Sequence, residues 1–309
     1  MKIGFIGNFE APYSTENDRK WSLMMLGHDV LKFQENKTSF GDLKKHAKNI
    51  DVLVYSHTHG WNIKGLPTAF ANFKKMGVPT VSIHLDRWAW LEREKDVGKE
   101  ATWFTEYYFM ADCSPEAIEL YKKNGLDLKK VFYLPPGATD RFCYQSAPDP
   151  IKFPHEIIFT GSKGYHKEYP FRPKLVEWLH KTYGDRFGHY GDDLPVVRGH
   201  DLNVLYATAK IVVGDSCFGG RPYYVSDRYY EVRGRNGFLL HPHVRGVDTV
   251  GVVHYKPENL DSLKSKIDYY LENEMPRERL RNAGFIHVKN NEAHVNRSKI
   301  VIERIFNGK

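Results

Sequence analysis

Arg228 and Glu231 are the charged pair whose spacing and surroundings most clearly favour binding chemistry. The segment 226–240 predicts a short helix with Ser226 as N-cap, followed by a glycine turn and a buried strand. Residues three apart share one helical face, so the two side chains either pair as a surface salt bridge or face a common ligand. The glycine-rich loop 214–222 favours the ligand, because free backbone N–H groups at a helix N-terminus attract an anion such as a diphosphate. The carboxylate would then accept hydrogen bonds from ribose hydroxyls.

Length and composition limit the class of protein. The 309 residues, 41% of them hydrophobic, are enough for two domains of about 150 residues each. No apolar run approaches about 20 residues and the first residues read as a strand, so we predict a cytoplasmic protein without integral membrane association. The three cysteines predict free thiols. The net charge of +7 favours anionic ligands, although a solvated basic surface explains it equally well.

The first half of the chain alternates apolar runs with helical patterns, which predicts a parallel sheet. Polar and aromatic residues follow the third and fourth predicted strands, where α/β sheets bind ligands. Catalytic candidates here are Asp86, as a general base, and His57. For Asp86 the alternatives are a helix N-cap or a salt bridge, and for the histidines and tryptophans the alternative is packing. The histidine pair lacks a third ligand at a recognisable spacing, so no metal is predicted. The predicted acceptor-side residues are His59, Trp61, Arg87 and Trp88.

The proline-rich segment 147–154 lacks periodicity and predicts a linker between two domains. Residues 155–164 then repeat the pattern of a strand closing on a glycine loop, so a second sheet begins there. We therefore predict an N-terminal domain over residues 1–147 and a C-terminal domain over residues 148–292. A last helix is predicted within residues 293–309.

Three segments together resemble the GT-B glycosyltransferases, especially the CgeB-like spore-maturation group. They are the loop with Arg-x-x-Glu and Gly-Phe-Leu-Leu within 214–240, the strand-Pro-x-Gly segment ending in Phe within 131–142, and the glycine loop of 155–164. The resemblance implies an α/β fold of two Rossmann-like domains with a cleft between them, and a last helix, 293–309, that packs back onto the first domain. One departure is Tyr223, which stands where many retaining members carry a first glutamate.

The resemblance implies a metal-independent glycosyltransferase that uses a nucleoside-diphosphate-sugar, by preference a UDP-sugar, and no further cofactor. The lack of an Asp-x-Asp motif is consistent with this mechanism, and the family's tendency favours retention of the sugar's configuration. In this picture Glu231 binds the ribose and Arg228 the diphosphate. Further implied or candidate donor contacts are Gly7, Asn8, Gly161, Ser162, Lys163, Arg172, Val197, Arg198 and Ser226. Lys163 and Arg172 can equally be ordinary surface cations.

The motifs do not indicate the acceptor, so it is predicted from charged and aromatic residues. Tryptophans beside Arg87, Arg93 and Lys64 are a combination that grips a phosphate backbone and stacks on a base or sugar. A hydroxymethylated base in phage DNA is therefore one candidate acceptor, beside glycans, proteins, lipid-linked sugars and small molecules. The alternative function is a non-catalytic protein that binds nucleotide or nucleic acid on a degenerate GT-B scaffold, which Tyr223 motivates.

Overall fold

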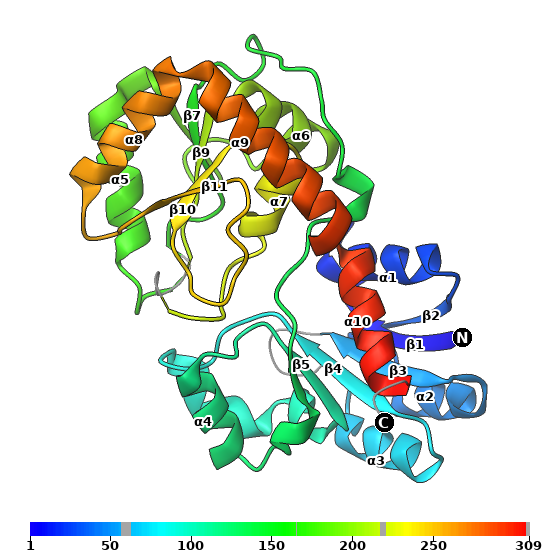
Figure 1. Ribbon diagram of the computed structural model, residues 1–309. Coiled ribbons are helices and arrows are strands. Elements are labelled where there is room, and N and C mark those ends of the chain that lie inside the picture. Colours follow the sequence, from blue (N-terminus) through cyan, green and yellow to red (C-terminus); the bar gives the residue numbers. More distant parts are fainter. Residues whose placement is uncertain (57–62, 165, 217–220, 307–309) are drawn as a thin grey trace. The chain divides into compact units, whose positions relative to one another are not determined.

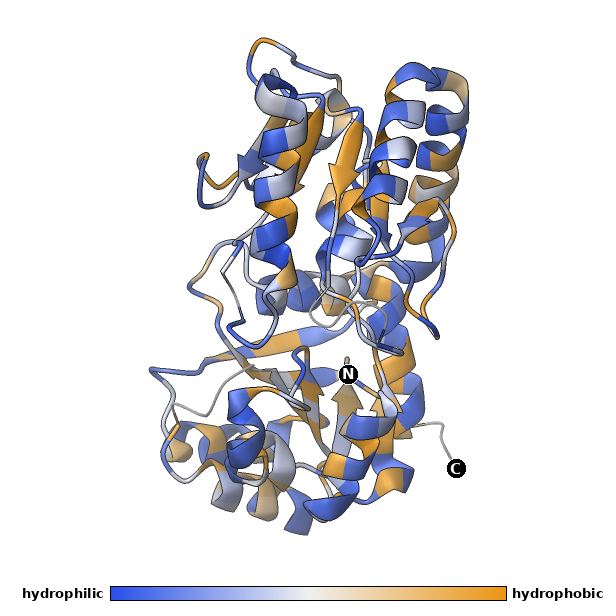
Figure 2. Cartoon of the chain, turned by 90° about the vertical axis from the view of Figure 1, so that its left-hand side faces the viewer, coloured by the Kyte–Doolittle hydropathy of each residue, from blue (hydrophilic) through white to orange (hydrophobic). Residues whose placement is uncertain are grey.

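The computed structural model describes residues 1–56, 63–164, 166–216 and 221–306 (Figure 1). The chain forms two compact units, the first made of residues 1–135 and 294–309 and the second of residues 136–293. Each unit contains one sheet whose strands are mainly apolar, whereas the helices alternate apolar and polar residues (Figure 2).

The first unit contains a six-stranded parallel sheet in the order β2-β1-β3-β4-β5-β6. Its strands are β1 (Lys2–Gly7), β2 (Asp29–Gln34), β3 (Val52–Ser56), β4 (Thr80–His84), β5 (Tyr107–Met110) and β6 (Val131–Tyr133). Its helices are α1 (Thr15–Met25), α2 (Phe40–His46), α3 (Leu66–Lys75), α4 (Pro115–Lys123) and α10 (His294–Phe306). The strand β2 lies on one side of β1 and the later strands lie on the other, so the switch point where such sheets bind ligands is between β1 and β3.

Two apolar layers cover the sheet of the first unit. Leu43 of α2 and Phe70 and Phe73 of α3 pack on one face, and Leu23 of α1 and Val301 of α10 pack on the other. Helix α10, the last in sequence, lies against α1, near the beginning of the chain (Figure 1). The first and last helices of the chain thus cover the same face of the sheet.

The second unit contains a five-stranded parallel sheet in the order β11-β10-β9-β7-β8. Its strands are β7 (Ile157–Thr160), β8 (Phe187–Tyr190), β9 (Ile211–Val213), β10 (Leu239–Pro242) and β11 (Val252–Tyr255). Its helices are α5 (Phe171–Tyr183), α6 (Gly199–Thr208), α7 (Arg228–Gly234), α8 (Leu260–Glu272) and α9 (Glu274–His287), and a π-helix spans Val288–Glu292. Helices α5 and α8 cover one face, and α6 and α7 cover the other. The switch point lies between β7 and β9, so the loops after these strands meet.

The boundary between the units lies at Pro135/Pro136, upstream of the predicted linker. Segment 136–146 belongs to the second unit because polar contacts hold it there. Thr139 donates to Glu231, and Asn203 Nδ2 donates to the carbonyls of Phe142 and Tyr144 at 2.8 and 2.9 Å. The proline-rich segment 147–154 therefore lies inside the second unit. The chain returns to the first unit after Ala293.

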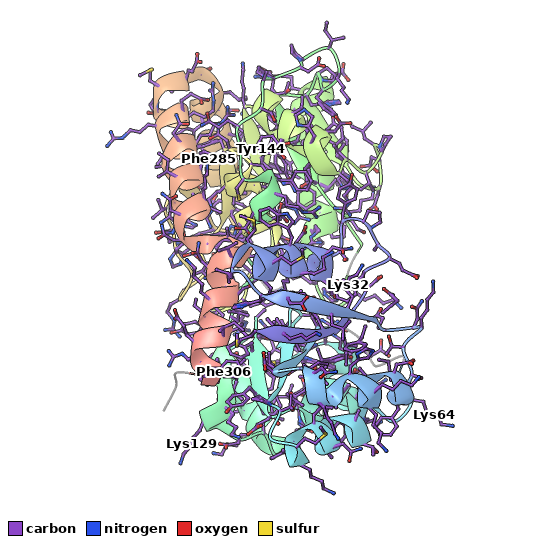
Figure 3. All side chains as sticks on the ribbon, turned by 90° about the vertical axis from the view of Figure 1, so that its right-hand side faces the viewer. Lys32, Lys64, Lys129, Tyr144, Phe285 and Phe306 are labelled. Atoms are coloured by element: carbon purple, nitrogen blue, oxygen red, sulfur yellow. The ribbon has the colours of Figure 1, made fainter. Side chains whose placement is uncertain are left out.

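None of the helices in the described ranges is long and apolar enough to cross a membrane. Lys64 and Lys129 extend from the first unit into solvent, and Lys32 is also exposed (Figure 3). Part of the net positive charge is thus spread over the surface of this unit.

Candidate functional site

Gly161 and Arg228 form the centre of the candidate site in the second unit. Gly161 directly follows β7 and has a φ of +102°, and a Cβ built on it would lie 2.3 Å from Arg228 Nη2. Only glycine permits both this backbone conformation and this close approach. The guanidinium of Arg228 stacks over the ring of Phe159 at 4.8 Å and donates to the carbonyl of Asp215 at 3.3 Å. The loops after β7 and β9 thus converge on one cation.

A second guanidinium, that of Arg172 on α5, belongs to the same corner, by which we mean the loops after β7 and β9 with Arg172 and Arg228. Its Nε donates to Asp215 Oδ2 at 3.2 Å and its Nη1 donates to the carbonyl of Ser162 at 3.1 Å. Tyr169 donates to the other oxygen of Asp215 at 3.0 Å. Burial raises the pKa of Asp215, and burial together with the nearby Arg172 lowers the pKa of Arg228 to about 10. Among the described contacts, the Asp215 carboxylate pairs with Arg172, whereas Arg228 donates to the Asp215 carbonyl, so an anion would neutralise the guanidinium that has no ion pair.

His241 adds no charge to this corner. Its Nδ1 lies 2.8 Å from the carbonyl of Pro242, so Nδ1 carries the proton and Nε2 accepts from the Ser216 hydroxyl at 3.0 Å. Burial lowers the pKa of His241 to about 3, which keeps the ring neutral near pH 7. The positive potential therefore comes from the two arginines.

The loop 161–163 is clamped by the residues that follow β8. The Gly161 amide donates to the carbonyl of Tyr190 at 2.8 Å, and Asp192 accepts from the amide of Lys163 at 2.7 Å and from the Ser162 hydroxyl at 3.3 Å. The Lys163 ammonium lies 2.7 Å from Asp193, whose pKa is held well below its usual range, first by that hydrogen bond. Lys163 is thus paired with a carboxylate, whereas Arg228 makes no ion pair among the described contacts.

Glu231 lies on the same short helix as Arg228 but contacts different groups. Its Oε1 accepts from the Thr139 amide at 2.6 Å and the Thr139 hydroxyl at 2.7 Å, and its Oε2 accepts from Arg235 Nε at 2.7 Å. Among the described contacts, Glu231 pairs with Arg235 and makes no ion pair with Arg228. The salt-bridge alternative for the original pair is therefore wrong, and the ribose role of Glu231 stays a prediction.

The expected N-cap is also wrong. Helix α7 begins at Arg228 after Asp227, which makes no side-chain cap bond, and the Ser226 hydroxyl is buried without a hydrogen-bond partner in the described part of the chain. The Ser226 hydroxyl therefore caps no backbone N–H of α7. The seven residues of α7 form a short helix, so the guanidiniums are the source of positive charge.

The remaining predicted donor contacts of the second unit lie near α6 and the loop before α7. Val197 is half-buried and packs against the core, whereas Arg198 is exposed and directly precedes α6. Tyr223, at the position of the missing glutamate, has a φ of +56°, which is a strained backbone conformation for an aromatic residue.

Asp86, the predicted base of the first unit, directly follows β4 together with Arg87 and Trp88. Asp86 pairs with Arg93 at 3.3 Å, and its carboxylate is 17% exposed. Arg87 and Trp88 are fully buried, which corrects their predicted place on the acceptor side. Arg87 lies 3.6 Å from the buried Asp112, and the Trp88 indole donates to His84 at 3.1 Å, so both side chains are held in the core.

Gly7 and Asn8 lie at the carboxyl end of β1, beside the switch point. Gly7 is buried, and a Cβ there would meet the side chain of Glu16 at 2.5 Å. Asn8 is half-buried, and its side-chain oxygen accepts from the Ala11 amide at 3.3 Å. The predicted residues His57, His59 and Trp61 lie outside the described residues.

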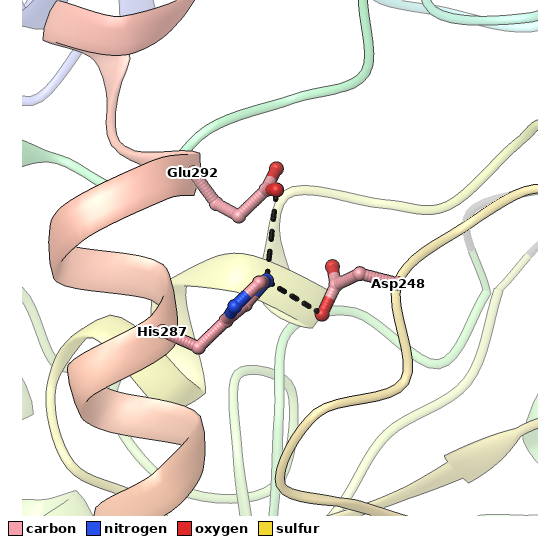
Figure 4. A group of neighbouring side chains, drawn as sticks. All are labelled: Asp248, His287 and Glu292. Atoms are coloured by element: carbon pink, nitrogen blue, oxygen red, sulfur yellow. Dashed lines mark ion pairs between the residues drawn. The ribbon is translucent and has the colours of Figure 1, made fainter.

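Asp248, His287 and Glu292 form a group with the donor atoms of a metal site, which the sequence did not reveal (Figure 4). His287 Nε2 lies 3.3 Å from Asp248 Oδ1 and 3.6 Å from Glu292 Oε1. Arg233 already grips both oxygens of Asp248, at 2.6 and 3.2 Å. A divalent ion would have to share this carboxylate with a guanidinium, so the described contacts fit a cluster of ion pairs that braces the loop after β10 against the π-helix.

Residues 172–303 match a family model described as glycosyl transferase-like. No curated protein sequence matches the chain. The match covers most of the second unit and therefore includes Arg172, Arg228 and Glu231.

Several solved structures resemble the whole chain. Sucrose-phosphate synthase from Thermosynechococcus elongatus is 11% identical, with a TM-score of 0.61 and full coverage of both chains. The N-terminal domain of trehalose-6-phosphate phosphatase from Candida albicans is 8% identical, with a TM-score of 0.57, and the alignment covers 98% of this chain and 96% of that one. The lipopolysaccharide outer core galactosyltransferase WaaB is 12% identical, with a TM-score of 0.55 and full coverage of both chains. The predicted fold class is confirmed: the chain has the α/β fold of GT-B glycosyltransferase structures, with two Rossmann-like units.

Proposed function

We propose that this protein is a glycosyltransferase that moves a sugar from a nucleoside-diphosphate-sugar to a hydroxyl acceptor. The observation that carries the proposal is the excess positive charge at Gly161, Arg172 and Arg228, at the switch point of the second sheet. A diphosphate would neutralise the Arg228 guanidinium, which makes no ion pair among the described contacts. The match of residues 172–303 to a glycosyl transferase-like family supports the same reading.

In this proposal the two guanidiniums stabilise the leaving diphosphate. Arg228, half-buried and stacked on Phe159, is held in place before the donor binds, so little reorganisation is needed as negative charge develops on the leaving group. Arg172 and Asp215 hold the loop around it. Charge neutralisation by arginine is the reason we propose a mechanism that needs no metal ion.

On the acceptor side we keep Asp86 as the proposed general base. Its carboxylate is partly exposed, pairs with Arg93 at 3.3 Å and directly follows β4, at the edge of the sheet where α/β folds bind their ligands. We propose that the sugar's configuration is retained. The anomeric signal in the NMR spectrum of the product measures this directly.

The proposal is tested by incubating the purified protein with UDP-, GDP- and ADP-sugars and measuring released nucleoside diphosphate. Slow hydrolysis of at least one donor is expected, with UDP-sugars the first choice, and variant Arg228→Ala should slow it. Variant Arg279→Ala is the matched control, because Arg279 is an exposed arginine of α9 in the same unit. Absence of turnover together with tight nucleotide binding would favour the alternative, a binding protein, which the strained Tyr223 in place of the glutamate supports.

For the acceptor we propose a hydroxymethylated base in DNA, on the evidence of the net charge of +7 and of exposed lysines such as Lys64 and Lys129. The burial of Arg87 and Trp88 removes two side chains that we expected to contact it. Binding to a duplex with hydroxymethylated pyrimidines should weaken steeply with salt, because each neutralised phosphate releases counterions. The readouts are a salt titration and the mass gain of the DNA. Salt-insensitive binding with no mass gain would rule out DNA as the acceptor and leave glycans, proteins, lipid-linked sugars and small molecules.

A further inference from the structure

Glu231 is held in place by an unusually complete set of hydrogen bonds for a residue expected to bind a ligand. A carboxylate offers about four acceptor positions, two on each oxygen. The Thr139 amide and hydroxyl fill both positions on Oε1, and Arg235 Nε fills one on Oε2. Among the described residues, one acceptor position on Oε2 remains. The side chain is 17% exposed, so this position can be reached.

Neither group that holds Glu231 is free to move away. Arg235 Nη1 donates to the carbonyl of Gly199 at 2.9 Å and to Asn203 Oδ1 at 2.5 Å, and its guanidinium stacks over Phe142 at 4.5 Å. The backbone next to Thr139 is fixed as well, because Ala138 pairs with Ala293. The carboxylate is therefore locked in one orientation with one vacant acceptor position.

We propose that Thr139 and Arg235 are positioning residues that limit Glu231 to a single hydrogen bond with the nucleotide. This inference rests on the proposed function, because it concerns the same donor site. The cis-diol of a ribose offers two O–H donors, and a carboxylate with two open positions would accept both. The Glu231 carboxylate accepts one hydrogen bond, so it binds one ribose hydroxyl. The other ribose hydroxyl makes no hydrogen bond with Glu231.

The inference is tested by calorimetric titration of the full-length protein with UDP, GDP and ADP. The nucleotide that binds most tightly is then compared with its 2′-deoxy and 3′-deoxy forms. One deoxy form should bind as tightly as the ribonucleotide, and the other should bind about 10- to 100-fold more weakly, as expected for loss of one hydrogen bond to a charged group.

Variant Thr139→Val separates a positioning role from a merely structural one. It removes the hydroxyl donor and opens a position on Oε1, so the deoxy form that was tolerated should now also bind more weakly than the ribonucleotide. Variant Thr139→Ser keeps the hydroxyl and should restore the single-hydroxyl pattern. Thermal unfolding of each variant checks that the protein is folded.

Each other outcome overturns the inference in a distinct way. If both deoxy forms bind the wild type weakly, Glu231 accepts both hydroxyls, and the proposed function stands without this inference. If neither form is weakened, Glu231 does not touch the ribose. If none of the three nucleotides binds, the proposed function itself fails.

Discussion

The corner at the switch point of the second unit and the segment after β4 in the first unit contain the same kinds of residues. Both place arginine and aspartate beside aromatic rings at the carboxyl end of a parallel strand. In the first unit Arg87 lies beside Asp112 and Arg93 beside Asp86, so each guanidinium has its own carboxylate. In the second unit Arg172 pairs with the buried carboxylate of Asp215, whereas Arg228 donates to the Asp215 carbonyl and makes no ion pair among the described contacts.

This difference separates a structural cluster from a site prepared for an anion. A buried pair of opposite charges satisfies itself and holds the chain in place, as Arg87 and Asp112 do. A cation whose pKa is lowered by burial and by a second cation gains most from a negatively charged ligand, as we propose for Arg228. Residue types alone are the same in both regions, and the charge balance distinguishes them.

The largest effect is expected for Asp86→Asn, which asks whether the first unit contributes to turnover. Because Asp86 is the proposed general base, its replacement should lower kcat by about 10²- to 10⁴-fold, while the affinity for nucleotide stays unchanged. Steady-state kinetics and nucleotide titration give the two numbers. Variant Asp96→Asn is the control, since Asp96 pairs with Lys99 on the surface of the same unit. An unaltered kcat would leave Asp86 as the structural partner of Arg93.

A smaller effect is expected for Gly161→Ala, which tests the close approach in the second unit. The new Cβ would collide with Arg228 and occupy a left-handed conformation, so we expect a loss of about 1–3 kcal/mol in the free energy of unfolding. Nucleotide affinity should fall as well, because the guanidinium is displaced. Gly164→Ala is the matched control: nothing lies within 4 Å of its added Cβ. Equal unfolding free energies and affinities for the two variants would refute this account of Gly161.

The sequence predicted the fold class well and the details of the site only in part. Alternating apolar runs and glycine loops are local signals, and they were sufficient to indicate two parallel sheets. The partners of the charged residues are not local: Arg172 meets Asp215 across 43 residues, and Glu231 meets Thr139 across 92. Asp215 stands directly after a strand in the glycine-rich loop, which is the signal that could have identified it. Nothing near Arg87 in the sequence indicates that it is buried beside Asp112.

The smallest effect at neutral pH is expected for His241, a buried histidine of the second unit. The pKa of His241 in the folded protein, about 3, is below the ordinary 6.5, so between these values the unfolded chain binds a proton that the folded chain excludes. Stability is therefore lost as the pH falls below about 6.5, by about 2 kcal/mol at pH 5 from this group. His241→Gln should reduce this loss in urea unfolding curves, whereas the exposed His46→Gln should not. Identical pH profiles for wild type and His241→Gln would show that His241 does not set the acid sensitivity.

The measurement that tests the central claim most directly is calorimetric titration of UDP-, GDP- and ADP-sugars into wild type, Arg228→Ala and Arg279→Ala. The claim is that Arg228 supplies the uncompensated charge that binds the donor diphosphate. We predict that the wild type and Arg279→Ala bind at least one donor equally well, and that Arg228→Ala binds it about 10- to 100-fold more weakly, as for a lost charged hydrogen bond. Equal affinity of all three proteins for that donor would contradict the account.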